Sequence, residues 1–499
     1  MVHTFGCLGR YFALDSESGS LFEVDETAKQ IIDSRNSSFA DAEGSFFAER
    51  ETDARAERKP NAYAETETRL NACAVGEFKA RTDAEQTAYA ETKICPQTER
   101  QVRTDAQQTA YAETEAEIEA LISEGALFSR GSAAAPRAYG GVIKSMCLNV
   151  SHRCNLRCAY CFAGGGSYGS DAENMSFDVA KRAVDFLVQN SGARKVLEVD
   201  FFGGEPTLNL DVVQKTVEYA RGLERPLNKT FRFTVTTNAY ALSDAAADFF
   251  NGEMHNVVIS IDGRKDVHNR VRKTAAGGGS FDNALKNAAK FRRLRGDKQY
   301  YVRGTYTRQN LDFAADALAL VDYGFDKISL EPVVLPDSHP LALRFDDLPA
   351  LFGQYELLAA EYLKRLGTDG EFLFFHFNVD LAGGPCEDKR LRSCGAGCEY
   401  VAVTPSGDVY PCHQFALDAE FRLGDVFSGR LDSAVQGRLW SNDVTNKPHC
   451  QGCFAKYFCS GGCAANSRNL AGGIERQHKI SCELMRKRIE CALAITSIK

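Results

Sequence analysis

The sequence has no long apolar run, no excess of positive charge and no start of the export type. None of its apolar stretches reaches the roughly 18 residues that a membrane-spanning helix needs, so we expect no membrane partner. The formal net charge of −8 argues against nucleic acid as the main partner. The segment Met1–Cys7 shows no basic region followed by an apolar stretch, which a secretory signal would have. We therefore expect a cytoplasmic protein.

Cysteine, in contrast, is abundant, with 17 in 499 residues. In a reducing compartment such thiols serve as metal ligands or reactive groups more often than as disulfides. None falls between Cys161 and Cys386, and most of them form a tight trio in the central region and a dense group near the end of the chain. Cysteines that only filled a core would be scattered, so this distribution predicts bound metal.

At this length two or three domains are expected, and the sequence pattern divides the chain into three regions. The first region, residues 1–130, has strand-like runs at His3–Leu14 and Ser20–Val24. Helices are predicted over Asp25–Ser34 and Glu115–Glu124.

A repetitive insert at about 41–114 interrupts the first region. The segment Arg81–Thr92 recurs with one change as Arg103–Thr114, a period of 22 residues. This period is short for a solenoid repeat, and few apolar residues are present to form a core. We therefore interpret the insert as a solvated, flexible addition.

The second region, about 140–340, alternates strand-like and helix-like segments. Six β–α units in series predict an α/β fold with a parallel sheet and helices outside it. Because six units fall short of the eight of a closed barrel, we expect a partial (β/α)6 barrel with its reactive residues at the carboxyl ends of the strands. The predicted strands are Ser145–Val150, Val196–Phe202, Phe231–Thr236, Val257–Ile261, Tyr300–Tyr306 and Lys327–Leu330.

Directly after the first of these strands comes a three-cysteine loop, Cys154-Asn-Leu-Arg-Cys158-Ala-Tyr-Cys161-Phe162. Thiolates suit iron–sulfur clusters and zinc, and both are usually held by four ligands, whereas this loop offers three. A four-iron cluster on three thiolates keeps one iron open for a substrate, which is a catalytic arrangement. The alternative is a zinc loop with a remote fourth ligand such as His152.

This loop, with an aromatic residue on each side of its last cysteine, resembles the radical S-adenosylmethionine (SAM) superfamily. The resemblance implies that Cys154, Cys158 and Cys161 hold a catalytic 4Fe–4S cluster whose open iron binds SAM. Segments at later strand ends, among them Gly203-Gly204-Glu205-Pro206, resemble cofactor contacts of that family. The cofactor-binding residues implied are Phe162, Gly203, Gly204, Glu205, Ser260 and Arg303. For Arg303 a surface ion pair is the alternative.

The third region, about 370–499, is rich in Gly and Cys, and metal is expected to organise it more than apolar burial does. Its spacing Cys450-x2-Cys453-x5-Cys459-x3-Cys463-x18-Cys482 resembles the SPASM extension of peptide-modifying radical enzymes, which holds two auxiliary 4Fe–4S clusters. The resemblance assigns one cluster to Cys450, Cys453, Cys459 and Cys482, and the other to Cys394, Cys412 and Cys463.

The fourth ligand of the second set stays open at this point. Cys386 has the better spacing, Cys398 is its rival, and an iron left open for a substrate thiol is a third possibility. A pair of zinc ribbons is the alternative for the whole region.

Segments near both ends narrow the resemblance further. Met1–Phe5, Phe22–Glu26 and Glu399–Gln414 resemble maturases of SCIFF peptides (six cysteines in forty-five residues), the ranthipeptide class. The resemblance implies that a 5′-deoxyadenosyl radical drives thioether formation, from Cys sulfur to carbon, in a ribosomally made, Cys-rich precursor. The N-terminal region would then be a winged-helix-like unit that grips the leader peptide by strand addition. The expected partners are that precursor and a small electron donor such as ferredoxin or flavodoxin, in an oxygen-poor cell.

Two other functions share parts of this pattern. An anaerobic sulfatase-maturing enzyme, which oxidises Cys or Ser to formylglycine, would use the same two-cluster extension but lacks a leader-gripping start. A non-catalytic carrier of electrons with several clusters would use the same thiolates. It would not need Gly203–Pro206 or a loop with only three ligands.

Overall fold

The computed structural model describes residues 2–37, 105–129, 140–171, 173–379 and 391–499. Most of the predicted insert at 41–114 lies outside the described residues; its last part, Asp105–Thr114, belongs to helix α2 (Asp105–Ser123).

The chain forms two compact units. One consists of Met1–Val24 with Gly125–Lys499, and the other of Asp25–Glu124. In the second unit, a helix at residues 26–37 is joined to α2 by an ion pair between Arg35 and Glu119 at 2.7 Å. The predicted region 1–130 is thus divided between the units.

Three antiparallel strands form an N-terminal sheet in the order β1 (Val2–Cys7), β2 (Arg10–Asp15), β3 (Leu21–Val24). The prediction of one strand over His3–Leu14 was wrong, because the chain reverses at Leu8 and Gly9. Both have positive φ, 55° and 74°. Such a two-residue turn suits the twist of a hairpin, but a leucine rarely adopts this conformation. The sequence therefore carries no ordinary turn signal there.

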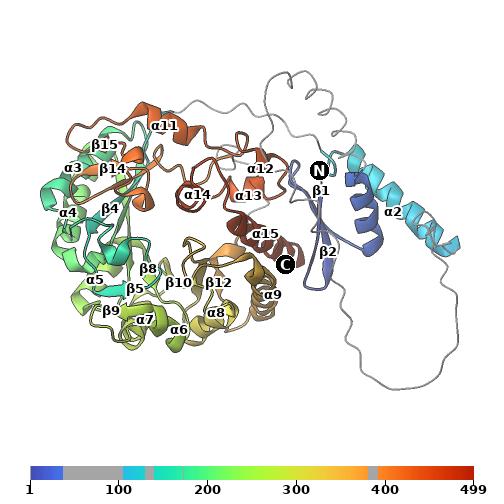
Figure 1. The fold of residues 1–499 in the computed structure, drawn as a ribbon, viewed down its shortest axis with the longest axis horizontal. Helices are drawn as coiled ribbons and strands as arrows, with labels where there is room; N and C mark the ends of the chain where they lie inside the picture. The colour runs from blue at the N-terminus through green and yellow to red at the C-terminus, as the bar shows by residue number, and fades with distance from the viewer. Residues whose placement is uncertain (1, 38–104, 130–139, 172, 380–390) are drawn as a thin grey trace. The chain divides into compact units, whose positions relative to one another are not determined.

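The central sheet has ten strands in the order β12-β11-β10-β8-β7-β6-β4-β13-β14-β15 (Figure 1). From β4 to β12 its strands are parallel and follow the order of the chain. This confirms the predicted α/β partial barrel, and the six predicted strands are found close to their predicted bounds. They are β4 (Ser145–Ser151), β6 (Val196–Gly203), β7 (Thr230–Thr237), β8 (Met254–Ser260), β10 (Tyr300–Tyr306) and β11 (Lys327–Pro332), followed by the short β12 (Leu373–Phe374).

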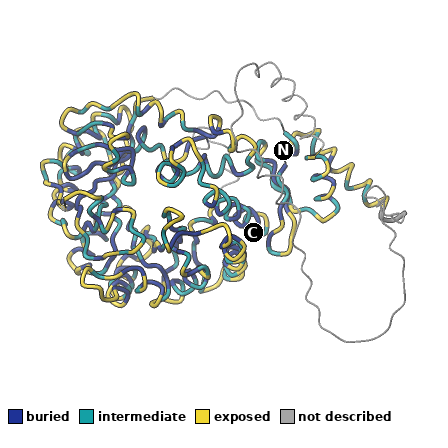
Figure 2. Tube along the Cα trace, viewed as in Figure 1, coloured by how far each residue is buried: buried dark blue, intermediate teal, exposed yellow. Residues whose placement is uncertain are grey.

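Helices cover the outer face of this sheet (Figure 1). In α3 the buried residues Ala180, Ala183, Val184 and Leu187 recur at the spacing of one helix face, and Ser176 caps the helix by accepting from the N–H of Val179. The strands and these inner helix faces form the buried core (Figure 2). The helices between strands are α3 (Phe177–Gln189), α4 (Leu210–Leu227), α5 (Asp244–Glu253), α6 (Lys265–Val271), α7 (Phe281–Arg295), α8 (Phe313–Asp322) and α9 (Leu348–Arg365).

The Cys-rich third region extends the barrel sheet. Its strand β13 (Tyr400–Val403) pairs parallel with β4 on the side away from β6, and β14 (Asp408–Tyr410) and β15 (Gly424–Asp425) follow antiparallel. No pattern in the sequence predicts the pairing of β13 with β4. The helices of the region are α11 (Ser433–Trp440), α12 (Pro448–Gln451), α13 (Lys456–Cys459), α14 (Ala464–Ala471) and α15 (Lys479–Ile498).

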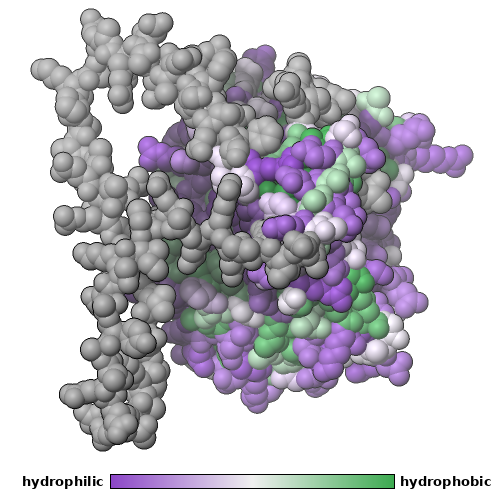
Figure 3. Space-filling view, turned by 90° about the vertical axis from the view of Figure 1, so that its right-hand side faces the viewer, coloured by the Kyte–Doolittle hydropathy of each residue, from purple (hydrophilic) through white to green (hydrophobic). Residues whose placement is uncertain are grey.

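On the face shown in Figure 3 hydrophilic side chains predominate, and apolar side chains gather in smaller areas. Within the described part of the chain, every helix is too short or too polar to span a bilayer.

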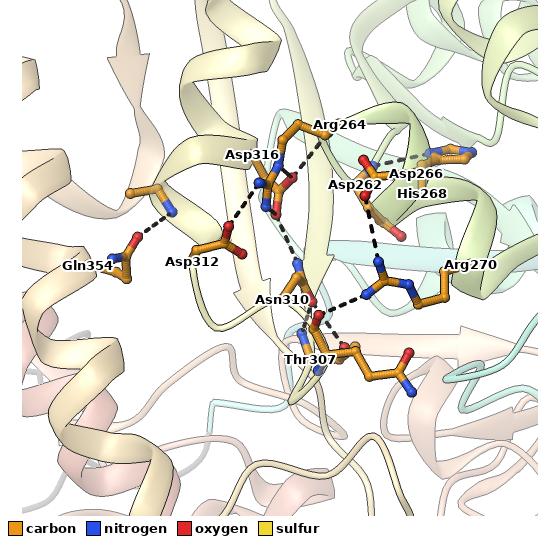
Figure 4. Close-up of polar contacts among 12 residues, drawn as sticks. Asp262, Arg264, Asp266, His268, Arg270, Thr307, Asn310, Asp312, Asp316 and Gln354 are labelled. Atoms are coloured by element: carbon orange, nitrogen blue, oxygen red, sulfur yellow. Dashed lines mark hydrogen bonds and ion pairs between the residues drawn. The ribbon is translucent and has the colours of Figure 1, made fainter.

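An ion-pair network fixes the loop after β8 to helix α8 (Figure 4). The Arg264 guanidinium binds Asp316 at 2.8 Å and Asp312 at 2.8 Å, and Asn310 donates to Asp316 at 3.0 Å. The Asp316 side chain is fully buried. The neighbouring Gly263 has a φ of 110°, and a Cβ there would lie 2.3 Å from the Cβ of Asp316. This loop therefore has one closely packed position, which also sets the start of α6.

We predict that Asp316→Ala lowers the free energy of unfolding by about 2 kcal/mol, because it leaves Arg264 and Asn310 without their buried acceptor. Asp312→Ala is the matched control, since it removes the other, more exposed carboxylate of the same arginine and should cost less than about 1 kcal/mol. Urea unfolding of the two variants measures the difference. Equal losses would contradict the account of the loop.

Candidate active site

The predicted cluster loop follows the carboxyl end of β4, as expected for a barrel of this kind. Part of it forms a short strand, β5 (Leu156–Cys158), which pairs antiparallel with β9 (Arg272–Thr274). Cys158 lies opposite Arg272 in this pair. The loop is therefore one strand of a two-stranded ribbon, and its backbone is fixed by hydrogen bonds to a distant part of the chain.

The three thiols of the loop are close neighbours. Burial raises the pKa of Cys158 to about 11, and the thiols of Cys161 and Cys154 contribute to this rise. Burial also raises the pKa of Cys154, with a further contribution from Cys161. Such coupling is expected of thiols in one short loop, and their assignment as ligands of one cluster stays a prediction. A group of three soft thiolates fits an iron–sulfur cluster.

The zinc alternative finds no support in this geometry. Among the residues that the structure describes, no three His, Cys, Asp or Glu side chains are placed to bind one metal ion. His152, the remote ligand of that alternative, has its Nδ1 3.1 Å from the Ser170 hydroxyl, and its buried Nε2 has no partner among the described residues. A zinc ion needs every ligand atom within about 2.3 Å, whereas each iron of a cluster takes its own thiolate. The thiols therefore fit a cluster better than a single ion.

The two glycines at the end of β6 lie against the cluster loop. The N–H of Gly204 donates to the Ser151 carbonyl at 2.7 Å. A Cβ on Gly203 would lie 2.3 Å from that same oxygen, and a Cβ on Gly204 would lie 2.3 Å from the Arg153 carbonyl oxygen. No side chain fits at either position, which explains in physical terms why the segment is Gly-Gly.

The carboxylate of Glu205, a predicted cofactor-binding residue, is hydrogen-bonded within the protein. It is buried and accepts from the Thr237 hydroxyl at 2.7 Å, the Asn238 N–H at 2.8 Å and the Thr207 hydroxyl at 2.8 Å. Burial raises its pKa, and these hydrogen bonds oppose that rise. Its carboxylate ties the ends of β6 and β7 together, so this segment offers a ligand its backbone more than this side chain.

Asn238 is a site residue that the sequence analysis missed. Its Nδ2 donates to Asn155 Oδ1 at 2.8 Å and lies 3.8 Å from the sulfur of Cys154. The only signal in the sequence is its position directly after the strand predicted at Phe231–Thr236. From there its amide reaches the first cysteine of the loop.

The other predicted cofactor residues lie around the same end of the barrel. Ser260 and Arg303 are neighbours in register on β8 and β10. Arg303 is half exposed and also forms the ion pair that was its alternative, at 3.3 Å from Glu331. Phe162 is 47% exposed, and its ring centroid lies 5.4 Å from that of His413. An exposed aromatic ring beside the cluster loop offers a surface to a bound molecule.

The electrostatic interactions among the C-terminal cysteines follow the two predicted sets. Burial raises the pKa of Cys459 to about 11, and Cys482, Cys450 and Cys453 contribute.

Two cations that were not predicted from the sequence lie beside this set. Burial lowers the pKa of Lys447, while Cys450, Cys459 and Cys482 oppose it. Burial likewise acts to lower the pKa of Arg486, but a hydrogen bond to Cys453 raises it overall. These cations would offset the charge of a bound cluster.

The second set consists of Cys394, Cys412 and Cys463. Burial raises the pKa of Cys412 to about 12, and Cys463 and Cys394 contribute. Cys398 does not join them: its thiol is buried and donates to the Gln436 carbonyl at 3.4 Å, and Arg392 and Glu399 are the charges that act on it. Cys386, the other proposed fourth ligand, lies outside the described residues.

Comparisons with known proteins agree with this layout. The family model of the Radical SAM superfamily matches residues 148–312, and that of the SPASM iron–sulfur cluster-binding domain matches residues 394–454. The chain is thus similar to radical SAM proteins over its central region and to SPASM domains over part of its third region. One of these families is named for SAM and the other for an iron–sulfur cluster, in line with the groups of thiols described above.

Two curated relatives illustrate the range of this group. A cysteine-type anaerobic sulfatase-maturating enzyme of Clostridium novyi is 26% identical over 355 residues, which cover 67% of this chain and 91% of the relative. Mycofactocin maturase MftC of Mycolicibacterium smegmatis is 29% identical over 341 residues, which cover 65% of this chain and 79% of the relative.

Solved structures confirm the fold of the radical SAM and SPASM regions. Native anSMEcpe with bound AdoMet is similar with a TM-score of 0.58 at 21% identity, covering 71% of this chain and 100% of that one. The same enzyme with AdoMet and the Cp18Cys peptide bound gives a TM-score of 0.59 at 19% identity, covering 72% and 99%.

We predict that Gly204→Ala abolishes loading of the catalytic cluster, because the new methyl group would collide with the Arg153 carbonyl and displace the loop. Gly222→Ala, in helix α4 with open space around it, is the matched control and should load normally. Iron content and cluster spectra after anaerobic reconstitution measure the outcome. Full loading of the Gly204→Ala variant would contradict the importance of this contact.

Proposed function

We propose that this chain is a radical SAM protein that forms thioether cross-links, from Cys sulfur to carbon, in a ribosomally made, Cys-rich precursor peptide. It would thus be a ranthipeptide, or SCIFF, maturase. Relatives that are maturases of peptides and proteins, and a solved relative with a peptide bound, support a peptide as the substrate. The observation that carries the finer proposal is the three-stranded sheet of Val2–Val24, built from the segments that resemble SCIFF maturases.

The third strand of that sheet offers an edge for a leader peptide. Among the described residues, β3 pairs only with β2. The N–H of Asp15 bonds to the Ser20 carbonyl at 2.9 Å, and hydrogen-bonded pairs alternate along an antiparallel ladder. The N–H of Glu23, opposite Phe12, therefore points away from β2. An extended peptide can pair with such an edge.

The second set of thiols supports a role for a substrate cysteine. Within the described residues it contains Cys394, Cys412 and Cys463, while Cys398 bonds to Gln436. These are three thiols among the described residues, and the soft thiolate of a peptide cysteine would be a suitable further donor. Such binding would orient the sulfur that enters the new bond.

The protein's own residues would act by binding and positioning. Cys154, Cys158 and Cys161 would hold the catalytic cluster, while Ser260, Arg303 and the backbone of Gly203-Gly204 would orient SAM. The bound groups would supply the redox chemistry for removing a hydrogen atom from a peptide carbon and for taking up the electron released as the carbon–sulfur bond forms.

Formation of formylglycine is the second candidate, favoured by the match to sulfatase-maturating enzymes. The two reactions differ in the fate of sulfur. A thioether keeps the sulfur of the cysteine and loses two hydrogens per bond, whereas formylglycine made from cysteine loses the sulfur. Mass spectrometry of a treated Cys-rich precursor decides between them, and loss of sulfur without cross-linking would overturn the thioether proposal.

We predict that replacing Cys154, Cys158 and Cys161 together by Ala abolishes 5′-deoxyadenosine formation and leaves the auxiliary clusters in place. The reason is that these thiols are coupled to one another, while the C-terminal thiols are coupled among themselves. Cys147→Ala is the control, since this buried thiol lies near Asn149 at 3.6 Å and is assigned to no cluster. Undiminished cleavage of SAM in the triple variant would refute the assignment.

Leader binding gives a further prediction. Glu23→Pro removes the outward N–H and should weaken binding of the precursor about tenfold, the value of one hydrogen bond. Glu23→Ala loses the ion pair with Arg10 but keeps the N–H, so it should bind almost normally. Titration against precursor with and without its leader provides the measurement. Equal affinity of both variants and the parent would mean that the leader binds elsewhere.

A further inference from the structure

A buried ion pair that has no part in the proposed function lies beside the cluster loop. Arg272 and Asp262 are 3.5 Å apart, with side chains 9% and 0% exposed. Tyr160, between the second and third cysteines of the loop, joins them: its hydroxyl donates to Asp262 at 2.7 Å and accepts from Arg272 at 2.7 Å. The pair is thus hydrogen-bonded directly to the loop.

Asp262 is held by donors on several elements. Besides Tyr160 and Arg272, the N–H of Thr305 donates to it at 3.1 Å. Burial raises the pKa of its carboxyl, and these partners oppose the rise. Its own N–H donates to His268 Nδ1 at 3.3 Å, the contact drawn in Figure 4. Because a permanently charged guanidinium and two further donors face it, Asp262 is present as a carboxylate.

Arg272 is placed to act on the cluster itself. It lies opposite Cys158 in the β5–β9 ribbon, so its position relative to that ligand is fixed by backbone pairing. Its charge opposes the effect of burial on the pKa of the Cys158 thiol. Among the described residues the Nε of Arg272 is buried and has no acceptor. A buried donor of this kind suits a partner that is present only when the cluster is bound.

We propose that Arg272 is a positioning residue that also raises the reduction potential of the cluster held by Cys154, Cys158 and Cys161, and that Asp262 opposes this effect. A reduced cluster carries one more negative charge than an oxidised one, so a nearby cation stabilises the reduced form and a nearby anion destabilises it. Charges buried this deeply are little screened by salt. The inference rests on the proposed function only in that these three thiolates hold an iron–sulfur cluster.

The pair makes opposite signs available to experiment. Removing Arg272 leaves Asp262 alone beside the cluster, whereas removing Asp262 leaves Arg272 alone. Arg272→Gln should therefore lower the midpoint potential of the catalytic cluster, and Asp262→Asn should raise it. The double variant should lie between the two. Lys273→Gln is the matched control, because it removes a positive charge from the next residue of β9, whose side chain is exposed, and should shift the potential least.

The test is a redox titration of the reconstituted full chain in which electron paramagnetic resonance measures the reduced clusters at each potential. Spectra of the variant with Cys154, Cys158 and Cys161 changed to Ala identify the auxiliary signals. Shifts of equal sign in Arg272→Gln and Asp262→Asn, or no shift in either, would overturn the proposal. If Arg272→Gln does not load its cluster, Asp262→Asn decides alone, and an unchanged or lowered potential overturns it. If the parent chain shows no signal that the triple variant lacks, the cluster assignment itself has failed.

Discussion

The candidate active site depends on a backbone contact between Gly204 and the start of the cluster loop. The N–H of Gly204 bonds to Ser151 at 2.7 Å, and that of Glu205 bonds to Arg153 at 2.9 Å. These two hydrogen bonds continue the pairing of β4 with β6 beyond the sheet, into the loop that carries Cys154. The cluster ligands thus inherit the rigidity of the barrel, and this is possible only because the approaching residues have no side chain.

Burying many thiols creates an electrostatic problem that the fold solves locally. Burial raises the pKa of Cys158, Cys412 and Cys459 alike, so each thiolate needs metal or a nearby cation to be stable. Arg272 lies beside the thiol of Cys158, and Lys447 lies beside the set that contains Cys459. Because ligands must lose protons to bind iron, loading of these sites is coupled to proton release. The buried cations reduce the cost of that step.

Much of this architecture could be predicted from the sequence, and the limits have physical causes. Strands such as β6 and β7 alternate buried apolar residues with more exposed ones, and spacing alone places the cysteines in a loop after the first strand. The hairpin turn at Leu8 was not predicted, because a positive φ is unusual for leucine. The roles of Asn238, Arg272 and Lys447 depend on contacts between distant segments, for which a local pattern carries no signal. The sequence likewise carried no signal that the carboxylate of Glu205 bonds to residues at the end of β7.

Helix α15 shows how the parts of the first unit act together. Cys482 lies in its first turn, within the set that includes Cys459. Two turns later Arg488 lies 3.7 Å from Glu331, which pairs with Arg303 at the mouth of the barrel. Further along, the sulfur of Cys491 is 3.8 Å from that of Cys7 on β1. One rigid helix therefore links an auxiliary site, the cofactor end of the barrel and the N-terminal sheet. A displacement at any of these sites must be accommodated at the others, because close-packed interiors transmit strain.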